Sequence, residues 1–270
     1  MDLEFKKLAV TKAEKIGIIT FNRPDIFNTI SFDTFRELEY ALKVFESDDK
    51  IKIILLKANC AVSKSNTKIF SAGINLKEYE KKFQMIEENP AEFEKLLKQA
   101  RSFLSKIETL KKPVIAGVDG LAVGVAFEII LACDLILVSD TAQFSFNEVN
   151  LGLIPGYGGI QRLIKAVGQK RTFEIVSSGR NIAAQEAMIA GFVAEICADS
   201  EFNKKSMEYC KKLAQKSSQS LWLTKDTINQ INSKPIHEEI EVKNFIKAAG
   251  YSDAKEGITA FIEKRAPNFI

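Results

Sequence analysis

Histidine is almost absent from this sequence, which contains a single one, His237, among 270 residues. Most zinc sites, and the Ser-His-Asp and Cys-His catalytic groups, depend on imidazole side chains. His237 lies in the segment Lys-Pro-Ile-His-Glu-Glu, where we predict the start of a polar helix and a solvated side chain. The sequence therefore predicts no metal site, and any catalysis would depend on carboxylates and backbone amides.

Paired cysteines and nucleotide-binding motifs are missing as well. The four cysteines form no C-x-x-C pair, which excludes a disulfide scaffold and favours reduced thiols in a cytoplasm. Neither G-x-x-x-x-G-K nor G-x-G-x-x-G occurs, so no P-loop or Rossmann nucleotide site is expected. The net charge is only +3, from 38 basic and 35 acidic residues, and we therefore expect no nucleic-acid partner.

No membrane segment is expected either. The most apolar stretch, residues 114–138, is interrupted by Asp119, Glu128 and Asp134, each of which is costly in hydrocarbon. The N-terminal residues Met-Asp-Leu-Glu-Phe-Lys-Lys have no apolar core of a signal peptide. We therefore predict a cytoplasmic protein.

What the chain does contain is a 46% hydrophobic composition and an alternation of strand-like and helix-like segments, which predicts the α/β class. Ser31 is the predicted N-cap of an amphipathic helix that runs to about Phe45. A polar surface loop is expected over residues 62–68. Predicted strands cover residues 15–21, 51–57, 114–118 and 135–139, and further predicted helices cover 76–84, 91–110 and 125–133.

The character of the sequence changes near Glu201, after which strand signals end and helical patterns with many lysines follow. No repeat and no Gly/Ser/Pro-rich linker separates the two parts. We predict a larger α/β part, residues 1–200, and a smaller helical part, residues 201–270.

A glycine-flanked turn, residues 119–124, precedes an apolar helix that carries a single acid, Glu128, in its first turn. Free amides at a helix N-terminus attract developing negative charge. A structural ion pair is the alternative for Glu128, but an unpaired buried glutamate is costly in an apolar helix. We therefore interpret Glu128 as a functional carboxylate beside an anion-stabilising backbone.

Two further segments could belong to the same site. Glu148 precedes a loop with four glycines between Gly152 and Gly159, which lets a backbone approach a ligand closely. Taken alone, Glu148 is more often a solvated loop residue. The segment Phe70-Ser-Ala-Gly73 is a small-residue turn after a strand and is a weak signal by itself.

Taken in order, these segments resemble the enoyl-CoA hydratase/isomerase (crotonase) superfamily along nearly the whole chain. The segments that carry the resemblance are Ile18-Ile-Thr-Phe-Asn-Arg-Pro24, Phe70-Ser-Ala-Gly73, Gly120 to Asp134, Leu151-Gly-Leu-Ile-Pro-Gly-Tyr-Gly-Gly-Ile-Gln-Arg-Leu163 and Ala260-Phe-Ile-Glu-Lys-Arg265. The resemblance is closest to the hydratases of this superfamily that use two glutamates.

The resemblance implies a superhelix of repeated ββα turns, followed by a helical domain that assembles trimers, often paired into hexamers. It also implies an acyl-CoA thioester substrate, with coenzyme A arriving as part of the substrate and no separate cofactor. The implied activity is hydration of a 2-enoyl-CoA in fatty acid metabolism, through an enolate held in an oxyanion hole.

Site residues follow by position from the same resemblance. Glu128 would orient and deprotonate the attacking water, and Glu148 would supply a proton to C2 of the substrate. The backbone amides of Ile74 and Val125 would form the oxyanion hole. The residues implied to hold the coenzyme A portion are Asp25, Phe27, Ser71, Gly73, Gly156 and Lys264.

Two departures from the family pattern concern the edges of this site. Asn75 stands where many relatives have aspartate, and Val125-Ala126 replaces a commoner small or glycine pair before the glutamate. Neither change removes a catalytic group. The acyl group stays open, because its length would be set by residues near 76–88 that no motif fixes.

Two alternatives to a hydratase stay open at this point. An enoyl-CoA isomerase, or another enzyme that forms an acyl-CoA enolate, could use the same fold with one acid. A noncatalytic oligomer that binds RNA through its lysine-rich helices is the alternative from another class. The low net charge and the presence of both glutamates count against that reading.

Overall fold

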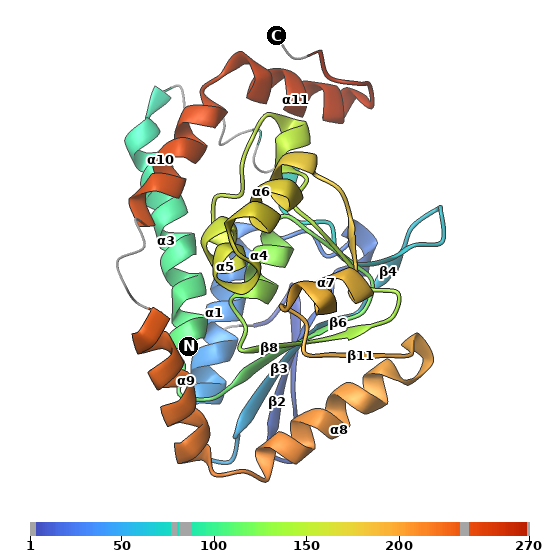
Figure 1. Ribbon diagram of the computed structural model, residues 1–270, viewed down its shortest axis with the longest axis vertical. Coiled ribbons are helices and arrows are strands. Elements are labelled where there is room, and N and C mark those ends of the chain that lie inside the picture. Colours follow the sequence, from blue (N-terminus) through green and yellow to red (C-terminus); the bar gives the residue numbers. More distant parts are fainter. Residues whose placement is uncertain (1–3, 77–79, 81–87, 233–237, 269–270) are drawn as a thin grey trace.

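Two β-sheets form the centre of the fold, and the chain alternates between them (Figure 1). The computed structural model describes residues 4–76, 80, 88–232 and 238–268. The first sheet has six strands in the order β1-β2-β3-β6-β8-β11, all parallel except for the β1-β2 hairpin. These strands are β1 (Leu8–Ala13), β2 (Ile16–Phe21), β3 (Ile53–Ala58), β6 (Val114–Val118), β8 (Leu135–Ser139) and β11 (Glu195–Cys197).

The second sheet has five short strands in the order β10-β9-β7-β5-β4. They are β4 (Ala61–Val62), β5 (Lys68–Ser71), β7 (Leu121–Val123), β9 (Gln143–Ser145) and β10 (Ile182–Ala183). The chain passes from β6 to β7 and then into the helix α4 (Val125–Leu131), and β8 is followed by β9 in the same way. This arrangement confirms the expected superhelix of ββα turns.

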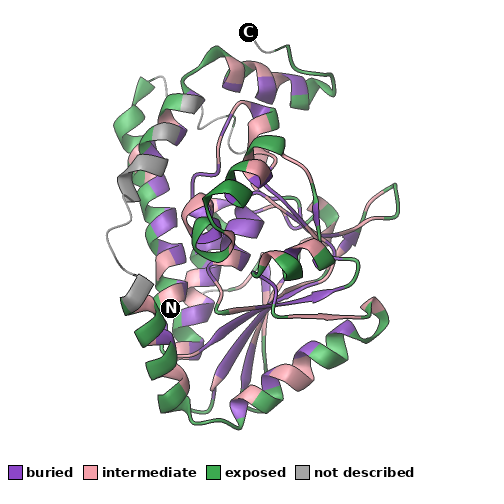
Figure 2. Cartoon of the chain, viewed as in Figure 1, coloured by how far each residue is buried: buried purple, intermediate pink, exposed green. Residues whose placement is uncertain are grey.

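The central strands of the first sheet are buried on both faces, as their continuous apolar sequences require (Figure 2). All five residues of β6 are buried. One face packs against the main hydrophobic core, and the helix α8 (Phe202–Ala214) packs on the other, where it contacts β2, β3 and β8. The predicted helical part therefore packs on the α/β part from its first helix onward.

The long helices begin and end close to where the sequence predicts. The helix α1 (Phe32–Ser47) starts at the N-cap Ser31, whose hydroxyl accepts a hydrogen bond from the Thr34 amide, and Thr34 Oγ1 accepts one from the Ser31 amide. The helix α3 (Pro90–Thr109) replaces the predicted 91–110. Residues 63–67 of the predicted loop 62–68 form the tip of the β4-β5 hairpin, whereas Val62 and Lys68 pair with each other in its strands.

The remaining helices surround the sheets and end in a helical C-terminal part. Downstream of β11, the portion of the chain that the structure describes contains no strand. In this part α9 (Ser218–Asn232) and α10 (Glu238–Ala249) pack on α3, and α11 (Ser252–Glu263) packs on the 3₁₀ turn η2 (Glu148–Leu151). The other helices are α5 (Gly159–Val167), α6 (Gln169–Ser178) and α7 (Ala184–Ala190), with 3₁₀ turns η1 (Pro24–Ile26) and η3 (Asp199–Glu201).

Some expectations fall where the structure does not describe the chain. His237 and most of the predicted helix 76–84 lie outside the described residues. Across the described residues, no helix is both long and apolar enough to cross a bilayer. The boundary at residue 200 and the assembly through residues 201–270 stay predictions. Leu223 and Ile228 of α9 are each 53% exposed, as apolar residues of an assembly face would be in one isolated chain.

Candidate functional site

The turn that follows β5 brings the backbone of residues 71–74 against the end of β7. Gly73 has a φ of +83°, and a Cβ atom at this position would lie 2.7 Å from the carbonyl oxygen of Val123. The Ser71 hydroxyl donates to the Asn28 carbonyl at 2.8 Å and accepts from the Gly73 amide at 3.2 Å. Glycine is therefore required here both by conformation and by the close approach of the two segments.

The amides of Ile74 and Val125 are both directed away from regular backbone pairing. Ile74 forms an isolated parallel bridge with Ile30, in which the hydrogen bonds run from Ile30 N to Gly73 O and from Asn75 N to Ile30 O. This pattern leaves the amide of Ile74 itself on the other side of the strand. Val125 is the first residue of α4, and the first amides of a helix have no acceptor within it.

Glu128 lies in the same helix and is only 1% exposed. Its Oε1 atom accepts two hydrogen bonds of 2.8 Å, from the amides of Tyr157 and Gly159. A Cβ atom on Gly159 would lie 2.7 Å from Glu128 Cγ and 2.7 Å from Phe146 Cζ. The glycine-rich loop therefore reaches the glutamate only because residue 159 has no side chain.

The second carboxylate oxygen of Glu128, Oε2, is buried and has no hydrogen-bond partner among the described residues. Burial raises the pKa of this carboxyl from its ordinary 4.5 to about 7, although the two amides and the positive charges of Arg162 and Arg101 act in the opposite direction. A carboxyl group held at one oxygen, with a pKa near neutrality, is suited to exchanging protons at the other.

Glu148 reaches the same place from β9, the strand that pairs with β7 in the second sheet. It begins η2, three residues after β9, and its Oε1 atom lies 2.7 Å from where a Cβ atom on Gly124 would be. Gly124 is the N-cap of α4 and has a φ of +56°. The Glu148 carboxylate therefore lies directly over the N-terminus of the helix that carries Glu128.

A cavity of about 80 Å³ joins these groups. Six of the predicted site residues line it, namely Gly73, Ile74, Val125, Glu128, Glu148 and Gly156. Apart from Glu128, Glu148, Asn147 and Tyr157, its described lining is apolar or backbone, and it includes no basic side chain. No group of three His, Cys, Asp or Glu side chains that could hold a metal ion occurs among the described residues.

The other four predicted residues lie outside this lining. Asp25 is exposed and pairs with Arg23, which lowers the pKa of the Asp25 carboxyl. Phe27 is 41% exposed, and its carbonyl accepts a hydrogen bond from the Ala72 amide at 3.0 Å. Ser71 is fully buried beneath the turn. Lys264 is exposed at the end of α11, three residues after Phe261, which does line the cavity.

Sequence reasoning did not identify Asn28, which ties three segments of the site together. It is 2% exposed, has a φ of +50°, and its side-chain amide donates to the carbonyls of Asn59 and Phe70 at 2.9 Å. Its Oδ1 atom accepts from the Arg23 amide at 2.7 Å. Asparagine tolerates left-handed conformations, so its place after the Asn-Arg-Pro-Asp turn was the only available signal.

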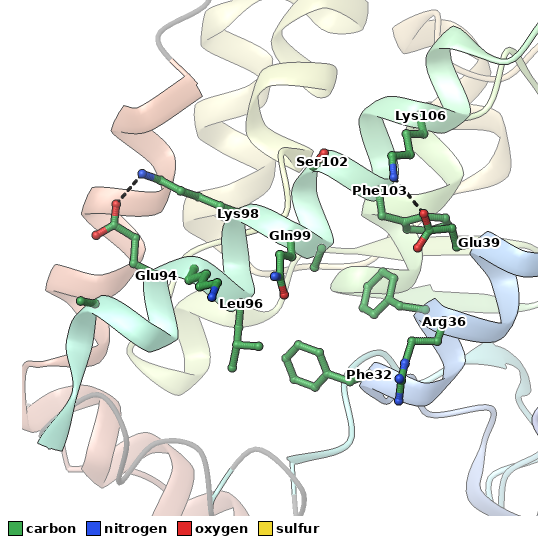
Figure 3. A pocket seen from close by; sticks show the side chains of 14 residues that line it. Phe32, Arg36, Glu39, Glu94, Leu96, Lys98, Gln99, Ser102, Phe103 and Lys106 are labelled. Atoms are coloured by element: carbon green, nitrogen blue, oxygen red, sulfur yellow. Dashed lines mark hydrogen bonds and ion pairs between the residues drawn. The ribbon is translucent and has the colours of Figure 1, made fainter.

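A second, larger cavity of about 970 Å³ lies between α1 and α3 (Figure 3). Phe32, Arg36 and Glu39 line it from α1, and Lys106 of α3 forms an ion pair of 2.8 Å with Glu39. No predicted site residue lines this groove. Phe35, which forms part of its wall, stacks on Tyr157 of the smaller cavity at 5.6 Å between ring centroids.

A family model described as enoyl-CoA hydratase/isomerase matches residues 11–270, almost the whole chain. The chain belongs to this family. In sequence it is 34% identical over 270 residues to a probable mitochondrial enoyl-CoA hydratase of Dictyostelium discoideum, covering 98% of this chain and 92% of that protein.

Solved structures agree with this membership in the enoyl-CoA hydratase/isomerase family. An enoyl-CoA hydratase subunit from Geobacillus kaustophilus superposes with a TM-score of 0.76 at 33% identity, covering 99% of each chain. A methylmalonyl-CoA decarboxylase in complex with 2-nitronate-propionyl-CoA superposes with a TM-score of 0.84 at 26% identity, also covering 99% of each chain. Members of this fold thus differ in reaction, and the residues of the site must decide between them.

Proposed function

We propose that this protein is an enoyl-CoA hydratase, which adds water across the 2,3 double bond of a 2-enoyl-CoA thioester. The observation that carries the proposal is that Glu128 and Glu148 line one cavity together with the backbone of Ile74 and Val125. Two carboxylates can hold and activate one water molecule, and two amides can hold one oxyanion. Isomerisation of a double bond would need only one carboxylate.

The thioester carbonyl would lie between the amides of Ile74 and Val125. Negative charge develops on this oxygen as water attacks C3, and preorganised donors stabilise that charge more than they stabilise the neutral carbonyl. Removal of one such donor costs roughly 3 kcal/mol in other enzymes. The Gly73-Val123 contact, which fixes the two segments side by side, supports this role.

Water would be held between the two glutamates. Glu128 Oε2 is the atom that takes the proton from water, because Oε1 is already bound by the Tyr157 and Gly159 amides. The hydroxide oxygen bonds to C3, the electron pair of the double bond moves to the enolate, and Glu148 gives a proton to C2. Return of the proton from Glu128 to Glu148 completes the cycle, so that one water is consumed for each product.

The coenzyme A portion would be bound by the backbone near Asp25, Phe27, Ser71 and Gly73, on the outer side of the oxyanion segment. Gly156 borders the cavity on the opposite side. Lys264 would offer a positive charge to a phosphate group. The exposed ring of Phe27, and the hydrogen bond from the amide of Ala72, a cavity-lining residue, to the Phe27 carbonyl, support this role.

The acyl group would be uncharged. No basic side chain occurs in the described lining of the cavity to pair with a carboxylate on the substrate. A methylmalonyl group would bring a third carboxylate close to Glu128 and Glu148, at a cost in repulsion. The lining thus favours hydration over decarboxylation, despite the likeness of fold.

Assembly and location are part of the same proposal. We propose a homotrimer or a dimer of trimers, because the apolar residues exposed on α9 need a partner surface. The cytoplasmic location stays a prediction, since one relative is named as mitochondrial.

The test is incubation with crotonyl-CoA, with longer 2-enoyl-CoA thioesters, with a 3-enoyl-CoA and with methylmalonyl-CoA, followed by mass analysis of the products. A hydratase adds the mass of one water to the 2-enoyl-CoA thioesters, and the dependence of kcat/KM on chain length identifies the preferred acyl group. Conversion of the 3-enoyl-CoA alone would make the protein an isomerase, and loss of carbon dioxide would make it a decarboxylase. Salt-sensitive retention of RNA with no turnover would revive the RNA-binding alternative.

A further inference from the structure

A buried arginine, Arg162, lies directly behind the loop that holds Glu128. It is 9% exposed, and its Nη1 atom donates to the Tyr157 carbonyl at 3.0 Å while its Nη2 atom donates to Glu108 Oε2 at 2.7 Å. Glu108 lies in the last turn of α3, and its carbonyl accepts a hydrogen bond of 2.6 Å from Asn229 of α9. The guanidinium is thus held between one helix end and one loop carbonyl.

The same loop residue contacts both Arg162 and the candidate base. The carbonyl of Tyr157 accepts from Arg162, and the amide of Tyr157 donates to Glu128 Oε1. The next residue, Gly158, has a φ of +94°, and any Cβ atom at this position would collide with the Arg162 guanidinium. The turn 157–159 is therefore enclosed between a cation on one side and the Glu128 carboxylate on the other.

We propose that Arg162, held by Glu108, is a positioning residue that fixes the turn 157–159 on the Glu128 carboxylate. This inference rests on the proposed role of Glu128 as the base. Arg162 does not touch the substrate, because it is absent from the described lining of the cavity. It acts through the two amides that orient Glu128 and through its charge.

The cost of removing the Arg162 guanidinium from water is not fully offset by hydrogen bonds, which is unfavourable for a residue with only a structural role. Its Nε atom has no hydrogen-bond partner within the described part of the chain. Buried ion pairs are often no more stabilising than apolar residues of the same volume. The guanidinium donates to the Tyr157 carbonyl and to Glu108 Oε2. These charge-assisted hydrogen bonds fix the loop to the end of α3, which an apolar side chain could not do.

The charge also acts on the proton affinity of Glu128. Three charged groups on surrounding elements face this carboxyl group: Arg162 from α5, Arg101 from α3 and Glu148 across the cavity. The two arginines favour the ionised form of Glu128, against its burial. Loss of Arg162 should therefore raise the pKa of Glu128 and move the rising limb of the pH-rate profile to higher pH.

The chain offers a matched control for this arginine in Lys225 of α9. Lys225 is 8% exposed, forms an ion pair of 2.8 Å with Asp134, and donates to the carbonyl of Ile107 at 2.9 Å. It therefore shares with Arg162 a buried charge, a carboxylate partner and a bond to the end of α3. Its hydrogen bonds and its ion pair go to Ile107 and Asp134, not to residues 157–159.

The experiment compares Arg162→Met, Arg162→Lys and Lys225→Met with the wild type. The protonation of Glu128 is followed in the resting enzyme by ¹³C-glutamate spectroscopy, as the difference between each protein and the same protein carrying Glu128→Gln. Arg162→Met should raise the pKa of Glu128 and lower kcat by up to about 100-fold with little change in KM. Arg162→Lys keeps the charge and should leave the pKa nearer the wild-type value with only partial loss of kcat.

Lys225→Met should lower stability while leaving both the pKa of Glu128 and kcat unchanged. An unchanged Glu128 pKa in Arg162→Met, or equal effects of Arg162→Met and Lys225→Met, would overturn the proposal. Should Arg162→Met fail to fold, Arg162→Lys decides, since a structural ion pair would tolerate lysine with kcat intact. If the wild type hydrates no enoyl-CoA, the proposed function fails, whereas the titration of Glu128 still decides the role of Arg162.

Discussion

Replacing Glu128 by glutamine should stabilise the folded protein above pH 7 and at the same time lower the rate of hydration at least 100-fold. Burial raises the pKa of this carboxyl from 4.5 to about 7. Between these two pH values the folded protein keeps a proton that the unfolded chain has released. The free energy of unfolding of the wild type should therefore fall as the pH rises through this window.

The magnitude follows from the size of the shift. Each pKa unit corresponds to about 1.4 kcal/mol, so the rise from 4.5 to about 7 corresponds to about 3 kcal/mol. This penalty is absent below about pH 4.5, where both states are protonated, and complete above about pH 7. Glutamine does not ionise, and its amide oxygen can still accept from Tyr157 and Gly159. The variant should therefore lack the decline.

Chemical denaturation at about pH 5 and about pH 8 measures most of the effect, because at pH 5 part of the unfolded chain has already released this proton. The change in unfolding free energy between these two pH values should differ between wild type and Glu128→Gln by about 2.5 kcal/mol, whatever the mutation does to packing. Hydration at about pH 8 should fall at least 100-fold. Glu37→Gln replaces another buried glutamate bound by backbone amides and should leave hydration intact. Parallel pH dependence of wild type and Glu128→Gln would refute the reasoning.

Other perturbations test the remaining parts of the site. Glu148→Gln should cut hydration at least 100-fold while thioester binding, measured by calorimetry, survives. Gly159→Ala should lower kcat by displacing Glu128, because its methyl group would lie 2.7 Å from Cγ, whereas Gly250→Ala, with no atom closer than 3.5 Å, should not. Lys264→Asn should weaken acyl-CoA binding strongly at low salt and less at high salt. If the variant and the wild type bind acyl-CoA with equal affinity at both salt concentrations, Lys264 is not part of the site. Sedimentation should give a trimer or hexamer, and a stable monomer at micromolar concentration would exclude that assembly.

Local signals in the sequence predicted the long helices and four strands of the first sheet, but gave residue ranges for none of the five short strands of the second sheet. The N-cap at Ser31 and the buried strands 114–118 and 135–139 have their cause in nearby residues, and the structure places them where predicted. The strand β1, which was not predicted, has mixed burial and no clear alternation. It is held instead by pairing with β2 and by the Glu37 carboxylate, which accepts from the amides of residues 6–8. The Glu37 contacts join residues about 30 positions apart and leave no local pattern.

The candidate site was predictable only in part, for the same reason. Glu128 was apparent as a lone acid in an apolar helix, and Gly73 as part of a small-residue turn. The partners of Glu128, the amides at Tyr157 and Gly159, carry no side-chain signal, because any residue has an amide. Only the fold shows that this turn meets α4. Arg162 likewise reads as an ordinary helical arginine until Glu108 and Tyr157 are placed around it.

The two oxygens of Glu128 have different surroundings, and this difference links its position to its reactivity. Oε1 is fixed by two backbone amides, which cannot rotate away or change protonation at neutral pH. Oε2 has no partner among the described residues and belongs to a side chain that lines the cavity. A proton can therefore be gained or lost at Oε2 without any change in the hydrogen bonds that hold the carboxylate. Burial sets the proton affinity of Glu128, and the turn 157–159 sets the orientation of its carboxylate. Each property can therefore be altered by a separate substitution.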